Sequence, residues 1–152
     1  MFWSTTHISY LQRIDIEFKG SLRPHQIPAV NSDIDYCAEK GHACGLLELD
    51  CAAGKTVLSL NLIARLKLKT LMIVNKEFLL NQWVERITEF LPTARIGRIQ
   101  GSIVSVENKD IVIGMLQSLL SDHLILSRYV CSNIVANIVS NIYMYVMRHV
   151  RT

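Results

Sequence analysis

The residues Gly54-Lys55-Thr56 have the types and the order that binding of a triphosphate requires. In the phosphate-binding loop G-x-x-x-x-G-K-[ST], glycines allow backbone N–H groups to turn toward phosphate oxygens, and the lysine reaches the terminal phosphates. The hydroxyl of the last residue helps to hold Mg²⁺. Leu49 stands where this pattern has its first glycine. The motif predicts a nucleotide site if a strand precedes it and a helix follows; otherwise it is an ordinary turn with Lys55 and Thr56 in solvent.

The hydrophobic pattern around the motif predicts that strand and that helix. Short apolar runs at 44–49, 70–74 and 110–114 are typical of buried strands, and apolar residues at helical spacing predict helices over 55–66 and 76–91. The other expected elements are a half-buried strand at 14–18, a helix from Arg23 to about Glu39 with Pro28 in its first turn or kinking it, and a short strand near 96–99. This alternation indicates a three-layer α/β fold of the P-loop type with a mainly parallel sheet.

The composition argues against several classes of protein. Half of the 152 residues are apolar, which fits one folded domain and not a disordered chain. Residues 1–122 contain 13 Lys and Arg and 13 Asp and Glu, so any nucleic-acid contact must be local and not the result of a global basic excess. None of the four cysteines forms a C-x-x-C pair, which disfavours a zinc site. No secretory signal opens the chain, so we expect an intracellular location, cytoplasmic or nuclear.

Five segments in order, within residues 14–120, resemble the first RecA-like domain of superfamily 2 helicases. The nearest branch is that of the XPB-like and UvsW-like DNA helicases, which also occur in large DNA viruses. The segments are 22–26 (LRPHQ, resembling L-R-P-Y-Q), 49–56 (resembling L-P-C-G-A-G-K-T), 74–83 (resembling V-P-x-K-x-L-L-x-Q-W), 97–101, and 110–119 (resembling D-I-V-I-A-T-V-Q-S-L). That family has a non-glycine at the first loop position, so Leu49 is normal there.

The resemblance implies that the chain binds ATP with Mg²⁺ and contacts DNA. The implied ATP-binding residues are Arg23, Gln26, Cys51, Ala52, Ala53, Gly54, Lys55 and Thr56, with Gln26 contacting adenine and Thr56 holding Mg²⁺. The implied nucleic-acid residues are Lys76, Gln82, Gly101, Gln117 and Ser118. The second set also fits a surface lysine, a solvated glutamine and helix-capping side chains. A virion location is an option if the chain is viral.

Four residues depart from the family pattern. Ala52 replaces a glycine, and its methyl group would obstruct close approach of a phosphate. Asp50 would repel a triphosphate unless its carboxylate faces away. Asn75 and Met115 replace a proline and a threonine, which would weaken contacts on the DNA side. Ala52 and Asp50 favour the alternative of a truncated, non-enzymatic paralogue.

Hydrolysis of ATP needs further acids, one for Mg²⁺ and one to orient water. In the family both belong to a D-E-x-H strand that follows the last matching segment, yet no Asp or Glu occurs beyond Asp122. We therefore assign no catalytic residue in this chain. We expect DNA unwinding to belong to the full-length relative. A second helicase domain could act in trans. The alternative is a catalytically inactive, truncated paralogue that serves as a binding module or has no function.

The chain is expected to divide into an N-terminal extension (1–20), a partial RecA-like domain (21–122) and a divergent apolar tail (123–152). Residues 129–147 carry no charge over 19 residues, which approaches the length of a membrane span. Asparagines at 133, 137 and 141 argue against a membrane, because amides are costly in lipid. This stretch also fits a helix packed on the domain, a poorly folded end, or the frameshifted end of a longer helicase gene.

Overall fold

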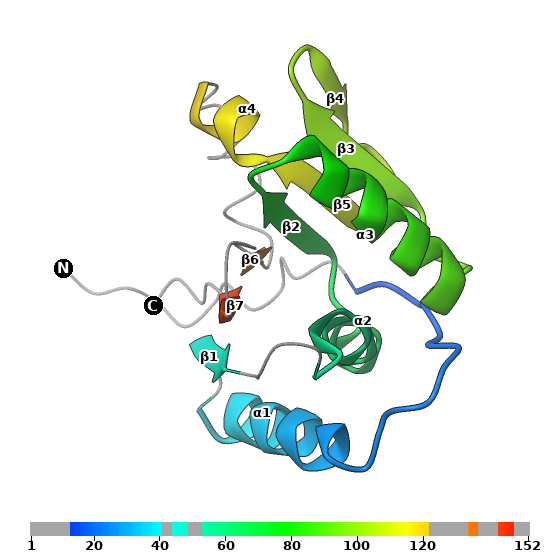
Figure 1. Cartoon of the computed structure of the whole chain (residues 1–152), viewed down its shortest axis with the longest axis vertical. Helices are drawn as coiled ribbons and strands as arrows, with labels where there is room; N and C mark the ends of the chain where they lie inside the picture. The colour runs from blue at the N-terminus through cyan, green and yellow to red at the C-terminus, as the bar shows by residue number, and fades with distance from the viewer. Residues whose placement is uncertain (1–12, 41–43, 49–52, 122–133, 137–142, 148–152) are drawn as a thin grey trace, which may run out of the picture.

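The computed structural model describes residues 13–40, 44–48, 53–121, 134–136 and 143–147 (Figure 1). In chain order its elements are α1 (Gln26–Lys40), β1 (Cys44–Glu48), α2 (Lys55–Leu66), β2 (Thr70–Val74), α3 (Glu77–Phe90), β3 (Ile96–Gln100), β4 (Ile103–Ser105), β5 (Ile111–Met115), α4 (Leu116–Ser121), β6 (Ile134–Ala136) and β7 (Tyr143–Met147). The strand before the nucleotide motif and the helix after it are both present. The predicted alternation of strands and helices is confirmed.

The strands form one sheet in the order β1-β7-β6-β2-β5-β3-β4. The pairs β6–β2, β2–β5 and β5–β3 are parallel, whereas β7 and β4 run antiparallel to their neighbours. Because two antiparallel steps separate β1 from β6, β1 points the same way as β6, β2, β5 and β3. The sheet is therefore mainly parallel, as predicted, and the carboxyl ends of these five strands lie at one edge.

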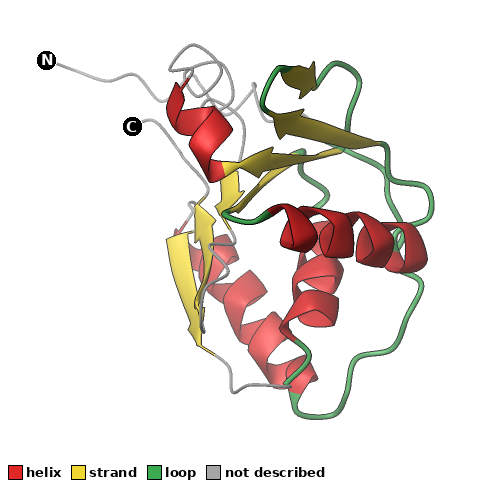
Figure 2. Cartoon of the chain, turned by 45° about the horizontal axis from the view of Figure 1, so that its top comes forward, coloured by secondary structure: helices red, strands yellow, loops and turns green. Residues whose placement is uncertain are grey.

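The main core lies between one face of this sheet and the helices α2 and α3, with α1 packed on α2 (Figure 2). On the sheet side it contains Met72, Val74, Ile111 and Ile113. On the helix side the fully buried residues include Val30, Leu58, Leu62, Leu80 and Ile87, and Trp83 is nearly so. These residues recur at the three- to four-residue spacing that directs one stripe of a helix at a sheet.

A smaller core lies on the opposite face of the sheet, under α4. Leu119 of α4 packs there with Leu71, Ile99 and Val112. Gly114 makes this close approach feasible, because a Cβ at that position would lie 2.8 Å from a methyl carbon of Leu119. Within the described residues, α4 is the helix of the third layer.

The strand expected at residues 14–18 is wrong. This segment is extended, and Ile14 and Ile16 are buried while Asp15 is exposed, so the alternation is real. It lies beside the end of α2, where Arg13 forms an isolated bridge with Leu68 and the backbone N–H of Ile14 donates to the carbonyl oxygen of Lys67 at 3.1 Å. The period-two pattern of residues 14–18 therefore reflects an extended segment with one buried face, and not a strand paired in a sheet.

Of the alternatives considered for residues 129–147, the helix is wrong where the structure describes this stretch. Residues 134–136 and 143–147 are strands, and β7 pairs with β1 along its whole length. Residues 134–136 contain an isoleucine and a valine, and residues 143–147 contain two tyrosines and a valine. These residue types favour strands. In the part of the chain that the structure covers, no helix is long and apolar enough to cross a bilayer.

Candidate nucleotide site and nucleic-acid edge

Gly54 ends the nucleotide loop in a conformation that favours glycine. Its φ and ψ are 78° and 39°, in the left-handed region, and it is the N-cap of α2. Lys55 and Thr56 follow as the first two residues of that helix and are partly exposed. Their backbone N–H groups have no acceptor within the helix, and the first turn contains no acidic residue. This helix end therefore presents N–H groups and positive dipole to a ligand, as a phosphate site requires.

Gln26 connects the first helix to this loop. Its Nε2 donates hydrogen bonds to the carbonyl oxygens of Ala53 at 2.8 Å and Gly54 at 3.2 Å. The ring Nε2 of His25 lies 3.4 Å from the same Ala53 oxygen. Gln26 is only 1% exposed. The two elements that sequence reasoning joined to ATP are thus in direct contact, through bonds that the sequence pattern could not reveal.

The start of α1 explains how Gln26 comes to this position. Its Oε1 accepts a hydrogen bond from the backbone N–H of Arg23, three residues earlier, at 2.8 Å. This is the reciprocal half of a capping box, and Pro24 stands directly after Arg23, where its fixed φ suits a first helical turn. Pro28 falls within the first turn of α1, one of the two positions expected for it.

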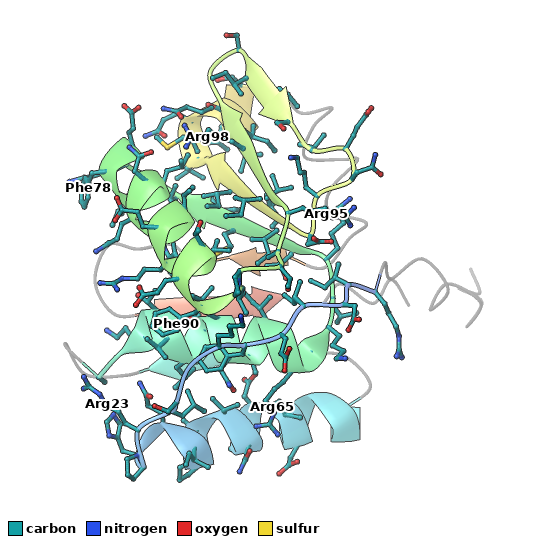
Figure 3. The ribbon with its side chains drawn as sticks, turned by 90° about the vertical axis from the view of Figure 1, so that its right-hand side faces the viewer. Arg23, Arg65, Phe78, Phe90, Arg95 and Arg98 are labelled. Carbon is teal, nitrogen blue, oxygen red and sulfur yellow. The ribbon has the colours of Figure 1, made fainter. Side chains whose placement is uncertain are left out.

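The other predicted nucleotide residues lie differently. Cys51, Ala52 and Asp50 fall outside the described residues, so the structure places neither the alanine nor the acid that oppose phosphate binding. The side chain of Arg23 is exposed at the start of α1 (Figure 3), and its contribution to the loop comes through its backbone N–H.

Three residues predicted to contact nucleic acid, Gly101, Gln117 and Ser118, lie with Asn75 beyond the carboxyl ends of β2, β3 and β5. Gln117 Nε2 donates to the carbonyl oxygen of Asn75 at 3.0 Å, and the backbone N–H of Gly101 donates to Ser118 Oγ at 2.8 Å. Gly101 has φ 57°, which lets β3 turn at this point. The side chains of Gln117 and Ser118, both predicted to contact nucleic acid, therefore connect α4, which follows β5, with the segments that follow β2 and β3.

Lys76 lies at this edge, two residues after β2, and Gln82 lies on the exposed side of α3. Lys76 is the N-cap of α3, and its Nζ lies 6.0 Å from the ring centroid of Phe78. Phe78 is 63% exposed and points away from α3 into solvent (Figure 3), a feature that sequence reasoning missed. Asn75 Oδ1 is buried and has no hydrogen-bond partner among the described residues.

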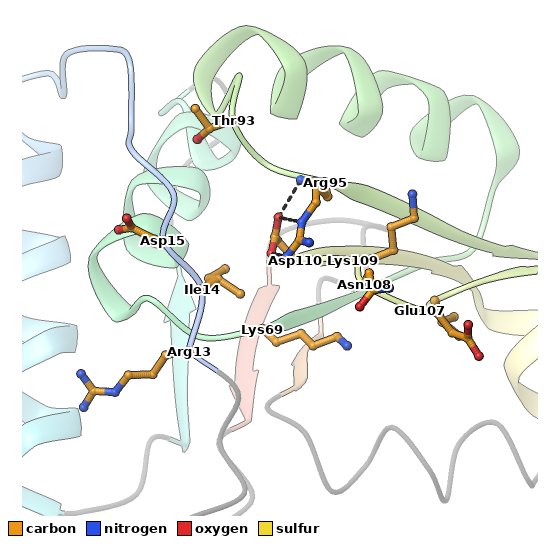
Figure 4. A pocket seen from close by; sticks show the side chains of 11 residues that line it. Arg13, Ile14, Asp15, Lys69, Thr93, Arg95, Glu107, Asn108, Lys109 and Asp110 are labelled. Atoms are coloured by element: carbon orange, nitrogen blue, oxygen red, sulfur yellow. Dashed lines mark hydrogen bonds and ion pairs between the residues drawn. The ribbon is translucent and has the colours of Figure 1, made fainter.

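A pocket of about 830 Å³ lies at the opposite, amino-terminal edge of the strands (Figure 4). Four cationic residues line it, Arg13, Lys69, Arg95 and Lys109, and so do three acidic ones, Asp15, Glu107 and Asp110. The charges nearly balance, and none of these residues belongs to the predicted nucleotide or nucleic-acid set. The pocket is therefore not the predicted site.

Comparison with known proteins identifies the family. Residues 19–139 match the family described as the type III restriction enzyme, res subunit. This match covers most of the chain and extends past Ser121, where the recognisable segments stop.

Within the described residues, there is no group of three or more His, Cys, Asp or Glu that could bind a metal ion.

Similar proteins occur in large DNA viruses. The chain is 36% identical over 105 residues to a protein of Acanthamoeba polyphaga mimivirus designated an ATP-dependent RNA helicase, which covers 69% of this chain and 20% of that protein. It is 36% identical over 97 residues to a protein of Invertebrate iridescent virus 6 designated a helicase, covering 64% and 22%. The chain thus spans about a fifth of the length of these relatives.

The fold is similar to that of a solved ATPase core. The SWI2/SNF2 ATPase core of Sulfolobus solfataricus in complex with dsDNA aligns with a TM-score of 0.59 and 24% identity, over 74% of this chain and 24% of that one. The same core solved as the ATPase core domain aligns with a TM-score of 0.57 and 23% identity, over 80% and 26%. The chain belongs to the family of the type III restriction enzyme res subunit and is part of the N-terminal, RecA-like ATP-binding module of a superfamily 2 helicase.

Proposed function

We propose that this chain binds ATP with Mg²⁺ at the loop that precedes α2, and that it contacts DNA at the same edge of the sheet. The observation that carries the proposal is Gly54 in the left-handed region, directly before Lys55 and Thr56 at the free end of α2. In open α/β sheets, ligands bind outside the carboxyl ends of the strands, which is where this loop lies.

The residues at the start of α2 fit a magnesium nucleotide. In this proposal Lys55 contacts the terminal phosphates, and the Thr56 hydroxyl gives an oxygen ligand to the metal ion; both residues lie in the first turn of α2. Mg²⁺ commonly keeps several waters and is held by one or two protein oxygens together with phosphates, so a site with few protein ligands suffices. When bound, the ion would neutralise phosphate charge.

For the nucleic acid we propose Lys76, Gln82, Gly101, Gln117 and Ser118 as contact residues. Gly101 follows β3, and Gln117 and Ser118 lie in α4, directly after β5. The hydrogen bonds already described connect Gly101 with Ser118 and Gln117 with Asn75 at the carboxyl ends of the strands. Lys76 adds a positive charge beside them. Contacts of this kind go mainly to phosphate and sugar, so they position a strand without reading its sequence.

We further propose that these residues bind ATP without hydrolysing it. Residues 123–152 contain neither Asp nor Glu, so they cannot supply the carboxylates that hold Mg²⁺ and orient water. Unwinding of a duplex would belong to the longer relatives, whose length this chain covers to about a fifth.

The test is a titration of the purified chain with a fluorescent ATP analogue, with and without Mg²⁺, beside Lys55→Ala. Saturable, Mg²⁺-dependent binding that Lys55→Ala weakens at least about tenfold is expected, since the lost contact is charge-assisted. Lys19→Ala is the matched control, because Lys19 is an exposed lysine in the segment before α1. Absence of binding by a folded wild-type chain would overturn the proposal.

A further inference from the structure

Phe78 is an aromatic side chain that the packing of α3 does not use. The buried residues of this helix are Leu79, Leu80, Trp83 and Ile87, and all four belong to the main core. Phe78 lies outside that core and points into solvent (Figure 3). At 63%, it is the most exposed large hydrophobic side chain in the described part of the chain. Covering this ring with a ligand would therefore be favourable and would cost the fold nothing.

The neighbours of Phe78 are two of the residues proposed to contact nucleic acid. Lys76 Nζ lies over the Phe78 ring, 6.0 Å from its centroid, so a positive charge stands against the aromatic surface. Gln82 comes four residues after Phe78, and because both are exposed they are neighbours on one face of α3. Proteins that bind single strands combine a cation, which contacts the backbone, with an aromatic ring, on which a base stacks.

The rest of this helical face limits nucleic acid to the beginning of α3. Glu85 and Glu89 continue the exposed face toward the carboxyl end of the helix, where their carboxylates would repel phosphates. Arg86 does not offset them, because its Nη1 donates to Glu89 at 2.7 Å. Glu77, in the first turn, lies about 100° around the helix from Phe78 and does not share its face. Phe78 is therefore at the end of the face where a strand can approach.

A ring in this position distinguishes single strands from duplexes. Within a duplex each base is covered by the bases above and below it, so a side chain at the backbone cannot stack on it. An unpaired base presents its flat face, and every kind of base has one, so stacking requires no particular sequence.

We infer that Phe78 stacks on an unpaired base, and that the affinity it contributes is specific to single-stranded nucleic acid. This inference rests on the proposed function, since the same edge of the sheet provides the phosphate contacts. It adds a base contact to residues that were otherwise assigned to the backbone, and it makes Phe78 the residue that determines which form of DNA is held. An exposed ring also suits a protein interface, and the binding experiment separates the two.

The experiment measures, by fluorescence anisotropy, the affinity of the full chain for three DNA ligands of equal length. These are an oligothymidylate, an abasic strand with the same phosphates, and a duplex. Wild type should bind the oligothymidylate at least about fivefold more tightly than the abasic strand, the lower limit for stacking on one base. Phe78→Ala should lose this factor for the oligothymidylate and leave the affinities for the abasic strand and the duplex unchanged. Since no charge is removed, the salt dependence of binding should keep its slope.

Two variants and one control identify the ring as the cause. Phe78→Trp keeps an aromatic surface and should retain the wild-type preference for the oligothymidylate, whereas Phe78→Leu keeps an apolar side chain without a ring and should lose it. Val104→Ala is the matched control, because Val104 is a 47% exposed apolar residue on β4 outside the proposed contact set. It should leave all three affinities unchanged. An unchanged urea midpoint shows that each variant is folded.

The possible failures are distinguishable. If wild type binds DNA but Phe78→Ala binds the oligothymidylate equally well, the inference is overturned while the proposed contact set stands, and the ring is left for a protein partner. An equal loss for all three ligands would also overturn it, because the ring would then support Lys76 and not a base. If the folded wild type binds none of the three ligands, the proposed nucleic-acid function fails, and this inference fails with it.

Discussion

The guanidinium of Arg95 donates two hydrogen bonds to the carboxylate of Asp110, at 2.9 and 2.7 Å, and the backbone N–H of Arg95 donates a third, at 2.8 Å (Figure 4). The backbone N–H of Asp110 in turn donates to the Arg95 carbonyl at 2.8 Å. Arg95 lies just before β3 and Asp110 just before β5. This pair thus joins the starts of two neighbouring parallel strands.

Removing this carboxylate should destabilise the domain. Asp110 is 5% exposed, so Asp110→Ala leaves the Arg95 N–H without its acceptor inside the protein. We expect a loss of about 2 kcal/mol in the free energy of unfolding, measured by urea denaturation. The matched control is Asp15→Ala, which breaks the exposed pair with Lys67 at 3.3 Å and should cost less than about 1 kcal/mol. Equal losses in the free energy of unfolding for Asp110→Ala and Asp15→Ala would contradict this prediction.

The same pair predicts how stability depends on pH. The hydrogen bonds and charge of Arg95 lower the pKa of Asp110 in the folded protein, so the unfolded chain takes up this proton at a higher pH than the folded one. The contribution of Asp110 is therefore complete above the unfolded pKa of about 3.9 and is lost as the pH falls from there through the folded pKa. Burial raises the pKa of Asp33, which has the opposite sign.

The measurement is the urea midpoint between pH 2 and pH 7, values chosen about two to three units on either side of the unfolded carboxyl pKa. Wild type should lose stability more steeply on acidification than Asp110→Asn does. Because Asp33 is present in both proteins, the difference between the two curves isolates Asp110. Parallel curves would contradict the prediction.

Gly54 and Gly101 allow a matched pair of substitutions. Both have positive φ, at 78° and 57°, so alanine at either position should cost about 1–2 kcal/mol of stability. Only at Gly54 does the new methyl group meet Gln26 Nε2; at Gly101 nothing lies within 4 Å. We expect Gly54→Ala to abolish nucleotide binding and Gly101→Ala to retain it. Fluorescent ATP titration of both folded variants decides, and equal binding by both would contradict the role of the loop geometry.

The packing of α3 predicts a contrast between two leucines. Leu80 is fully buried against the main core, whereas Leu120 of α4 is 59% exposed. Leu80→Ala should lower the free energy of unfolding by about 2–5 kcal/mol, because it removes buried methyl groups and leaves a cavity. Leu120→Ala should change it by no more than about 0.5 kcal/mol. Similar urea midpoints for the two variants would show that α3 does not pack as described.

The nucleic-acid edge predicts a specific role for Lys76. If Lys76 contacts a phosphate, Lys76→Ala should weaken binding of single- and double-stranded DNA about equally for different sequences, and should reduce the salt dependence by about one unit of slope. Fluorescence anisotropy at several salt concentrations measures both quantities. Lys109→Ala, a change at the amino-terminal edge of the sheet, is the control and should leave the slope unchanged. An unchanged slope for Lys76→Ala would remove Lys76 from the proposed contact set.

The elements that position the nucleotide loop could be predicted because their patterns are local. The bounds of β1, α2 and β2 agree with the sequence prediction to within one residue. The contacts of Gln26 could not be predicted, because they join residues 27 and 28 positions apart and depend on how α1 packs on α2. The strand β4 was missed because it has three residues, all exposed, with no hydrophobic alternation to signal it.

The tail shows where a local pattern is not sufficient. An uncharged run such as residues 129–147 fits a buried helix and a buried strand equally well by composition. The strand conformation depends on pairing within the sheet, in which 143–147 pairs with β1 and 134–136 pairs with β2. Such partners are distant in sequence, so periodicity carries no information about them.

The pairing of β1 with β7 has a consequence for how the domain folds. β1 lies at the end of the strand order, and its neighbour in the sheet comes from residues 143–147, about a hundred positions later in the chain. Closing so large a loop is entropically costly and slow, so long-range pairing of this kind forms late. Because synthesis proceeds from the N-terminus, the ribosome completes the nucleotide loop long before it makes β7, the strand that pairs with β1. The capacity to bind a nucleotide should therefore be one of the last properties that the nascent protein acquires.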